Sequence, residues 1–108
     1  MQELIKRAGK IARLKGWWDD APTFGEFIAL CHSELSEALE EYRNNRGIGV
    51  DKIYYNGAKP EGIPTELADV VIRIFDYCDN MGIDLEAAII EKMDYNETRP
   101  YRHGNKVL

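Results

Sequence analysis

Residues 23–44 read TFGEFIALCHSELSEALEEYRN, and this stretch decides the fold. Thr23 is a typical helix N-cap, and Glu26, three residues later, completes a capping box. Apolar residues then recur every three or four positions from Phe24 to Tyr42, which is the spacing of a single stripe along one side of a helix. The stretch therefore predicts a long amphipathic helix that buries this stripe.

Three further helices are predicted on either side of it. They cover residues 2–15, with Gly16 as the C-terminal glycine, a stretch that begins after Pro64-Thr65 and runs to about Asn80, and residues from the N-cap Asp84 to about Glu97. Residues 43–63 are rich in Asn and Gly, so they predict a loop, and the tail 99–106 is polar and irregular. The expected fold class is all-α, a small four-helix bundle in a single domain over residues 1–108.

Composition narrows the class of protein. The chain has 108 residues, 44% of them hydrophobic and 31% charged, which is typical of one globular domain. No apolar run approaches the length of about 20 residues that a membrane span needs, so we expect a cytoplasmic protein with no membrane partner. Cys31 and Cys78 are too few for a disulfide scaffold and are expected to be buried as small hydrophobic residues.

The net charge of −5 is unevenly distributed. Residues 19–91 hold 5 basic against 16 acidic residues, a net charge of −11, whereas both ends of the chain are basic. A nucleic-acid-binding protein would show a basic surface overall, so we expect no nucleic-acid partner. The distribution is compatible with cations held at the centre and anions bound by the ends.

Two pairs of acids stand out within the acidic centre. Glu34 and Glu37 lie three residues apart along one flank of the apolar stripe, and Glu66 and Asp69 repeat this spacing on the third predicted helix. Side chains three residues apart lie on the same side of a helix, so each pair can direct two carboxylates at one point. Four carboxylates form the all-oxygen ligand set that Mg²⁺ or Mn²⁺ prefers. Such pairs also occur as solvated polar faces, and this alternative stays open for each pair taken alone.

Basic and aromatic residues supply a second set of candidates. Lys92, Asn96 and Arg99 are four and three residues apart, and Arg102 and Lys106 follow in the tail, a combination that suits phosphate oxygens. A solvated basic tail is the alternative. Trp17 is a candidate for stacking on a nucleobase, although adjacent tryptophans also serve as packing anchors.

These motifs resemble those of the MazG-like all-α nucleoside triphosphate pyrophosphohydrolases, in particular their phage and bacterial branch. The resemblance covers residues 24–106 and is carried by three stretches: HSELSEALEEYR at 32–43, KPEGIPTELADVVIRIFDYC at 59–78 and KMDYNETRPYRHGNK at 92–106. Ser33 is a departure, because many relatives have a second Glu there, and Glu40 or Glu41 could take its place.

The resemblance implies Mg²⁺-dependent hydrolysis of a nucleoside triphosphate between its α and β phosphates. Glu34, Glu37, Glu66 and Asp69 would hold the metal, and Glu37 is our choice among them for the group that accepts the proton of the attacking water. It also implies a homodimer or homotetramer that completes the bundle and the site. Two alternatives remain: a different substrate, such as a phosphoribosyl-nucleotide, or a non-catalytic helical dimerisation or regulatory module.

Overall fold

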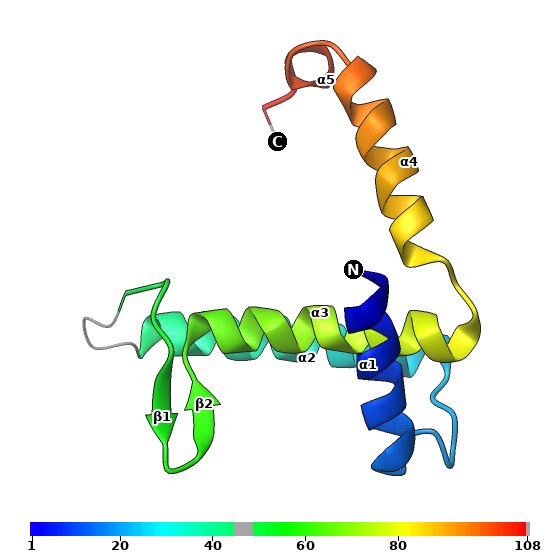
Figure 1. Cartoon of the computed structure of the whole chain (residues 1–108). Helices are drawn as coiled ribbons and strands as arrows, with labels where there is room; N and C mark the ends of the chain where they lie inside the picture. Colours follow the sequence, from blue (N-terminus) through cyan, green and yellow to red (C-terminus); the bar gives the residue numbers. More distant parts are fainter. Residues whose placement is uncertain (45–48, 108) are drawn as a thin grey trace.

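A computed structural model of the chain describes residues 1–44 and 49–107. Its elements follow the order of helices and hairpin shown in Figure 1, and most of the described chain is helical, which agrees with the all-α prediction. The elements are α1 (Gln2–Leu14), α2 (Phe24–Arg43), β1 (Tyr54–Asn56), β2 (Lys59–Glu61), α3 (Ile63–Met81), α4 (Leu85–Thr98) and the single turn α5 (Arg102–Asn105).

The helix ends follow the local signals in the sequence. The Thr23 hydroxyl accepts a hydrogen bond from the Glu26 backbone N–H at 3.1 Å, and the Glu26 carboxylate accepts one from the Thr23 N–H at 3.0 Å, so the predicted capping box is present. Gly16 follows α1 with a φ of 85°, and Gly82 ends α3 with a φ of 71°. Glycine adopts these left-handed conformations without steric cost, which stops each helix at the expected place.

Three helices form the packed body of the chain. α3 packs against α1 along one side and against α2 along another. The side chains with the least exposure come from all three helices, and they are Ile5, Ala8, Ala12, Cys31, Ala38, Tyr77 and Cys78. Both cysteines are thus buried and free, as predicted. Small residues dominate this set, so α1 and α3 approach closely where they cross.

The apolar stripe of α2 is only partly buried, which corrects the prediction that it faces the core. Cys31 and Ala38 are buried, whereas Ile28, Leu35 and Leu39 are 37%, 48% and 59% exposed. The reason is that α3 lies to one side of the stripe, next to the acidic flank of α2. A continuous apolar strip of α2 therefore remains on the surface of the single chain.

The segment predicted as a loop contains a short hairpin. β1 pairs with β2 in antiparallel register, with Tyr54 opposite Glu61 and Asn56 opposite Lys59. The turn between them contains Asn56-Gly57, and Gly57 has a φ of 64°, as tight hairpin turns require. The pair was missed because three-residue strands carry too little alternation to be recognised. The predicted loop also covers residues 45–48, which lie outside the described residues.

The fourth helix does not join the other three. In Figure 1, α4 points away from the α1–α3 body, and no residue of α4 is buried. The radius of gyration is 16.6 Å, against roughly 13 Å for a compact chain of this length. The single chain is therefore a three-helix body with a projecting helix. A four-helix bundle completed by oligomerisation stays a prediction.

Candidate metal and nucleotide site

Carboxylates from α2 and α3 converge on one point. Glu34 and Glu37 of α2 and Glu66 of α3 each place an oxygen within 4.8 Å of the others. The spacing of three residues brings the two α2 side chains together, and the packing of α2 against α3 adds Glu66. We call these three residues the acidic cluster.

Asp69 lies beside the acidic cluster without belonging to that closest group. Burial raises the pKa of Asp69, and the charges of Glu34 and Glu37 raise it further, while Arg73 and Lys59 act in the opposite direction. Asp69 of α3 therefore lies close enough to Glu34 and Glu37 of α2 for their charges to affect its pKa. The structure brings the four predicted metal ligands into one region, three of them in direct proximity.

The pKa of Glu66 is raised for the same kind of reason. Burial is the largest cause, and the neighbouring charges of Asp69, Glu37 and Glu34 add to it. One oxygen of Glu66, Oε2, is buried with no hydrogen-bond partner. A buried carboxylate oxygen without a partner is costly, because it has lost its water and gained nothing in exchange.

This orphaned oxygen tests whether a divalent metal fits the site. A cation at the acidic cluster would give Glu66 the missing partner and would reduce the repulsion among the three carboxylates. All the donors are oxygens, and neither histidine nor cysteine belongs to the cluster, so the donor set fits Mg²⁺ or Mn²⁺ better than Zn²⁺. The residues present fit the predicted metal.

Arg73 is a site residue that the sequence did not reveal. Its Nε donates to Glu34 Oε1 at 2.8 Å, and the Glu34 side chain is only 13% exposed. The guanidinium holds Glu34 against α3 and supplies the positive charge that a row of acids requires. The only signal in the sequence was that Arg73 falls on the same strip of its helix as Glu66 and Asp69.

The two acids that follow the first pair have separate roles. Glu41 accepts a hydrogen bond of 2.5 Å from the Tyr54 hydroxyl, and this bond raises the pKa of Tyr54 to about 12. Glu40 is exposed and contacts Arg43 and Asn44 of its own helix. Glu41 thus connects the hairpin to α2. Neither Glu40 nor Glu41 belongs to the acidic cluster, so neither takes the place of the glutamate expected at position 33.

An aromatic pocket of about 650 Å³ adjoins the acidic cluster. Glu34 and Asp69 line it, so they face both regions. Trp17, which is 73% exposed, lines the pocket as well. Other lining residues include Phe27, Ile72 and Tyr77.

Trp18 has a different role from its neighbour Trp17. Its indole Nε1 donates to Asp76 Oδ1 at 2.6 Å, and Asn80 Nδ2 donates to the same oxygen at 2.7 Å. Its ring also lies 6.1 Å from that of Tyr77, centroid to centroid. Trp18 therefore anchors the connection between α1 and α2 to α3. It also lines the pocket, but Trp17 is the more exposed of the two tryptophans.

The predicted phosphate-binding residues lie elsewhere in the chain. Lys92, Asn96 and Arg99 are carried by α4 and its C-cap, and Lys92 and Arg99 flank the ring of Tyr95 at 5.3 and 5.6 Å. Arg102 and Lys106 follow in the exposed tail. None of these residues lines the aromatic pocket or belongs to the acidic cluster. Within the single chain, these five residues therefore lie apart from the acidic cluster.

Comparisons with known proteins add no further constraint. No protein-family model, curated protein or solved structure matches the chain. Among the described residues, no helix has the length and apolar character needed to cross a membrane.

Proposed function

We propose that the chain is a Mg²⁺-dependent nucleoside triphosphate pyrophosphohydrolase that releases a nucleoside monophosphate and pyrophosphate. The observation that carries the proposal is the convergence of Glu34, Glu37 and Glu66 within 4.8 Å, with one buried oxygen of Glu66 lacking a partner. The aromatic pocket beside them supports a nucleotide rather than a simple phosphate as the ligand.

Each part of this region has a task in the proposed reaction. Glu34, Glu37, Glu66 and Asp69 would hold Mg²⁺, whose chemistry at such a site is to neutralise phosphate charge and to acidify a water molecule. Arg73 orients Glu34 through its 2.8 Å hydrogen bond. Glu37 is the exposed member of the acidic cluster, and we assign it the proton of the attacking water.

Substrate positioning is assigned to two groups of residues. Trp17 would stack on the base at the pocket rim, and Lys92, Asn96, Arg99, Arg102 and Lys106 would hold the phosphate chain. Positioning and charge stabilisation account for most of the catalysis of phosphoryl and related transfers, so both groups matter for rate. Because the cations are on α4 and in the tail, we propose that the enzyme works as a homodimer or homotetramer.

Product analysis tests the reaction. The purified chain is incubated with each common NTP and dNTP in Mg²⁺ or in EDTA, and the products are separated by ion-exchange chromatography. We expect monophosphate and pyrophosphate in Mg²⁺ only, and loss of turnover in Glu37→Gln and Asp69→Asn with retained helicity. Glu40→Gln is the matched control, since Glu40 lies on α2 outside the acidic cluster and should keep full activity.

The other outcomes are equally informative. Diphosphate and orthophosphate would mean cleavage at the wrong bond and would exclude the proposed reaction. Turnover only of a phosphoribosyl-nucleotide would replace the substrate while keeping the chemistry. No turnover of any of these, together with no effect of Mg²⁺ on thermal stability, would instead indicate the non-catalytic helical module.

A further inference from the structure

A strip of charged residues runs along α3 from the acidic cluster into the aromatic pocket. Its members follow one another at steps of three and four residues, and they are Glu66, Asp69, Arg73 and Asp76. This spacing places them on one side of the helix. Glu66 belongs to the acidic cluster, whereas Asp76 lines the pocket, about 10 Å further along the helix axis than Asp69. The strip therefore has a metal end at Glu66 and a pocket end at Asp76.

The Asp76 carboxylate is held in place by two donors that reach the same oxygen. Trp18 Nε1 donates to Asp76 Oδ1 at 2.6 Å, and Asn80 Nδ2 donates to it at 2.7 Å. Asn80 is fixed in turn by Arg13, whose Nη1 donates to Asn80 Oδ1 at 2.7 Å. Among the residues that the structure describes, the hydrogen bonds to this carboxylate all end on Oδ1. Asp76 thus offers a fixed acceptor, Oδ2, at the wall of the pocket.

Carboxylates dominate the polar lining of the aromatic pocket. Of the described residues that line it, one is basic, Arg73, and five are acidic: Asp20, Glu26, Glu34, Asp69 and Asp76. The Arg73 guanidinium is engaged by Glu34, and the Trp18 indole N–H is used by Asp76. An ionised carboxylate only accepts hydrogen bonds. The pocket therefore favours a ligand that brings N–H donors of its own.

The aromatic rings of the same lining suit a flat ligand. The rings of Phe27 and Tyr77 stack with a centroid distance of 4.0 Å and an interplanar angle of 9°, and Trp17 lines the pocket with an exposed ring. Aromatic rings of this kind bind flat heterocycles by stacking. A heterocycle that carries N–H donors on its edge meets both requirements, and a nucleobase with an exocyclic amino group is such a heterocycle.

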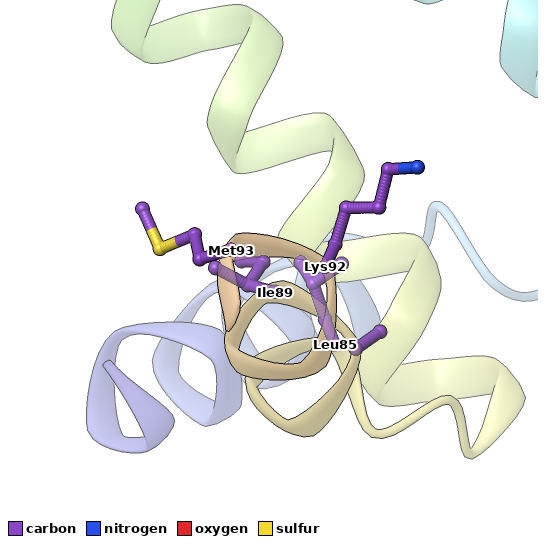
Figure 2. A pocket seen from close by; sticks show the side chains of 5 residues that line it. Leu85, Ile89, Lys92 and Met93 are labelled. Atoms are coloured by element: carbon purple, nitrogen blue, oxygen red, sulfur yellow. The ribbon is translucent and has the colours of Figure 1, made fainter. Parts of the chain in front are cut away.

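The hollow on α4 does not offer this combination. It is lined by Leu85, Ala88, Ile89, Lys92 and Met93 (Figure 2). None of these side chains is aromatic or acidic, so they can neither stack on a base nor accept a hydrogen bond from its amino group through a carboxylate. Of the two hollows, the aromatic pocket is the one whose lining suits a base.

The edges of the nucleobases differ in how they meet a fixed carboxylate. The amino group of cytosine or adenine projects from the ring and donates outward, and guanine carries such a group beside a ring N–H. The ring N–H of uracil or thymine lies between two carbonyl oxygens, which a carboxylate repels. A site acceptor that faces a carbonyl instead of an amine also loses its hydrogen bond and gains nothing in exchange. Oδ2 of Asp76 therefore favours the amino-bearing bases.

We propose that Asp76 makes the aromatic pocket selective for nucleobases that carry an exocyclic amino group, which donates to Asp76 Oδ2. Trp18 and Asn80 are positioning residues for this carboxylate. The inference rests on the proposed function for the nucleotide as ligand, and it goes beyond that function by naming the class of base and the residue that selects it.

Matched pairs of nucleotides test the selectivity. The pairs are CTP with UTP, dCTP with dUTP, and ATP with ITP, because in each pair a carbonyl replaces the amino group while the sugar and the triphosphate stay the same. The measured quantity is kcat/KM for pyrophosphate release in Mg²⁺. We expect the wild-type chain to favour the amino-bearing member by about 10–100-fold.

Asp76→Asn should lose or reverse this preference. The amide oxygen has to stay in the place of Oδ1 to accept from Trp18 and Asn80, so the amide N–H groups take the place of Oδ2 and donate to the carbonyl of the base. Asp79→Asn is the matched control: Asp79 lies on the same helix, pairs with Arg13 and is not among the lining residues of the pocket, so the wild-type preference should be kept.

The outcomes separate this inference from the proposed function. A wild-type chain that hydrolyses both members of each pair equally well overturns the selectivity and leaves the reaction standing. An Asp76→Asn variant that loses the same factor on both members also overturns it, because a purely structural role predicts that result. If the wild-type chain hydrolyses no nucleotide, the proposed function fails, and calorimetric titration with the α,β-methylene analogues of CTP and UTP in Mg²⁺ decides the selectivity. Tighter binding of the CTP analogue supports it, and equal or absent binding overturns it.

Discussion

Replacing Glu66 with Gln is expected to have opposite effects on the stability of the chain with and without Mg²⁺. Without metal, the substitution removes one of three neighbouring negative charges and converts a buried oxygen that lacks a partner into an amide. The new N–H groups can donate to the Glu37 or Glu34 carboxylate. The variant should therefore be more stable than the wild-type chain in EDTA.

The size of the effect follows from the geometry. Two unit charges 4.8 Å apart interact by about 3.5 kcal/mol at an effective dielectric constant near 20. Arg73 offsets part of this repulsion and solvent screens the exposed Glu37, so we expect a net gain of about 1–2 kcal/mol on removal of the Glu66 charge. For a domain of this size, that corresponds to a rise in melting temperature of about 5–10 °C.

In saturating Mg²⁺, the wild-type chain should instead be more stable than Glu66→Gln. A ligand that binds only the folded chain stabilises it in proportion to the logarithm of its concentration over Kd, so saturating Mg²⁺ should raise the melting temperature of the wild-type chain. Glu66→Gln should lose most of this rise, because it lacks one ligand oxygen. Thermal unfolding followed by circular dichroism in EDTA and over a Mg²⁺ titration measures both effects.

The control and the refuting results are equally specific. Glu40→Gln removes a carboxylate that faces solvent on α2, so both of its melting temperatures should match those of the wild-type chain. A Glu66→Gln variant that melts below wild type in EDTA would show that repulsion does not dominate at the acidic cluster. A variant that keeps the full Mg²⁺ response would show that Glu66 is not a metal ligand.

Three further predictions follow from other contacts. Glu66 and Asp69 have pKa values raised above those of the unfolded chain, so their ionisation destabilises the folded chain at neutral pH, and this penalty is lost as pH falls through their folded pKa values. Unfolding in EDTA should therefore show stability rising as the pH is lowered from 7 through these raised pKa values, with the slope reduced in Glu66→Gln. Gly9→Ala should destabilise the chain by about 1–3 kcal/mol in urea unfolding, since the added Cβ would lie 2.6 Å from the carboxylate carbon of Asp79 on α3. Gly25→Ala is the control: the nearest side-chain atom to its added Cβ is Thr23 Oγ1 at 4.0 Å, so this variant should be neutral or stabilising. Tyr54→Phe removes the hydrogen bond that holds the hairpin to α2, so amide hydrogen exchange should become faster in β1 and β2 and stay unchanged in α1. Exchange rates in the hairpin equal to those of the wild-type chain would disprove this anchoring role.

Local signals in the sequence determined most of the secondary structure. The capping box at Thr23, the glycines at 16 and 82 and the N-cap Asp84 act within one or two helical turns, so the residues themselves set where helices begin and end. The same locality made the acid pairs readable, because a spacing of three residues directs two side chains to one side whatever the helix packs against. These features could be predicted without knowing the fold.

The tertiary structure decided which sides of these helices meet. Periodicity shows that α2 has an apolar stripe, but α3 covers only the part beside the acids and leaves Leu35 and Leu39 exposed. The ion pair between Arg73 and Glu34 and the hydrogen bond from Tyr54 to Glu41 join residues 39 and 13 positions apart, which no local pattern specifies.

The sequence by itself thus determined the helices, their caps and the carboxylate pairs, because these depend on neighbours a few residues away. Only the tertiary structure determined that three of the four carboxylates meet, that Arg73 joins them and that the basic residues of α4 stay apart from them. The physical reason is that interactions between distant segments depend on the rotation and crossing of whole helices, and many arrangements of the same helices satisfy the same periodicity.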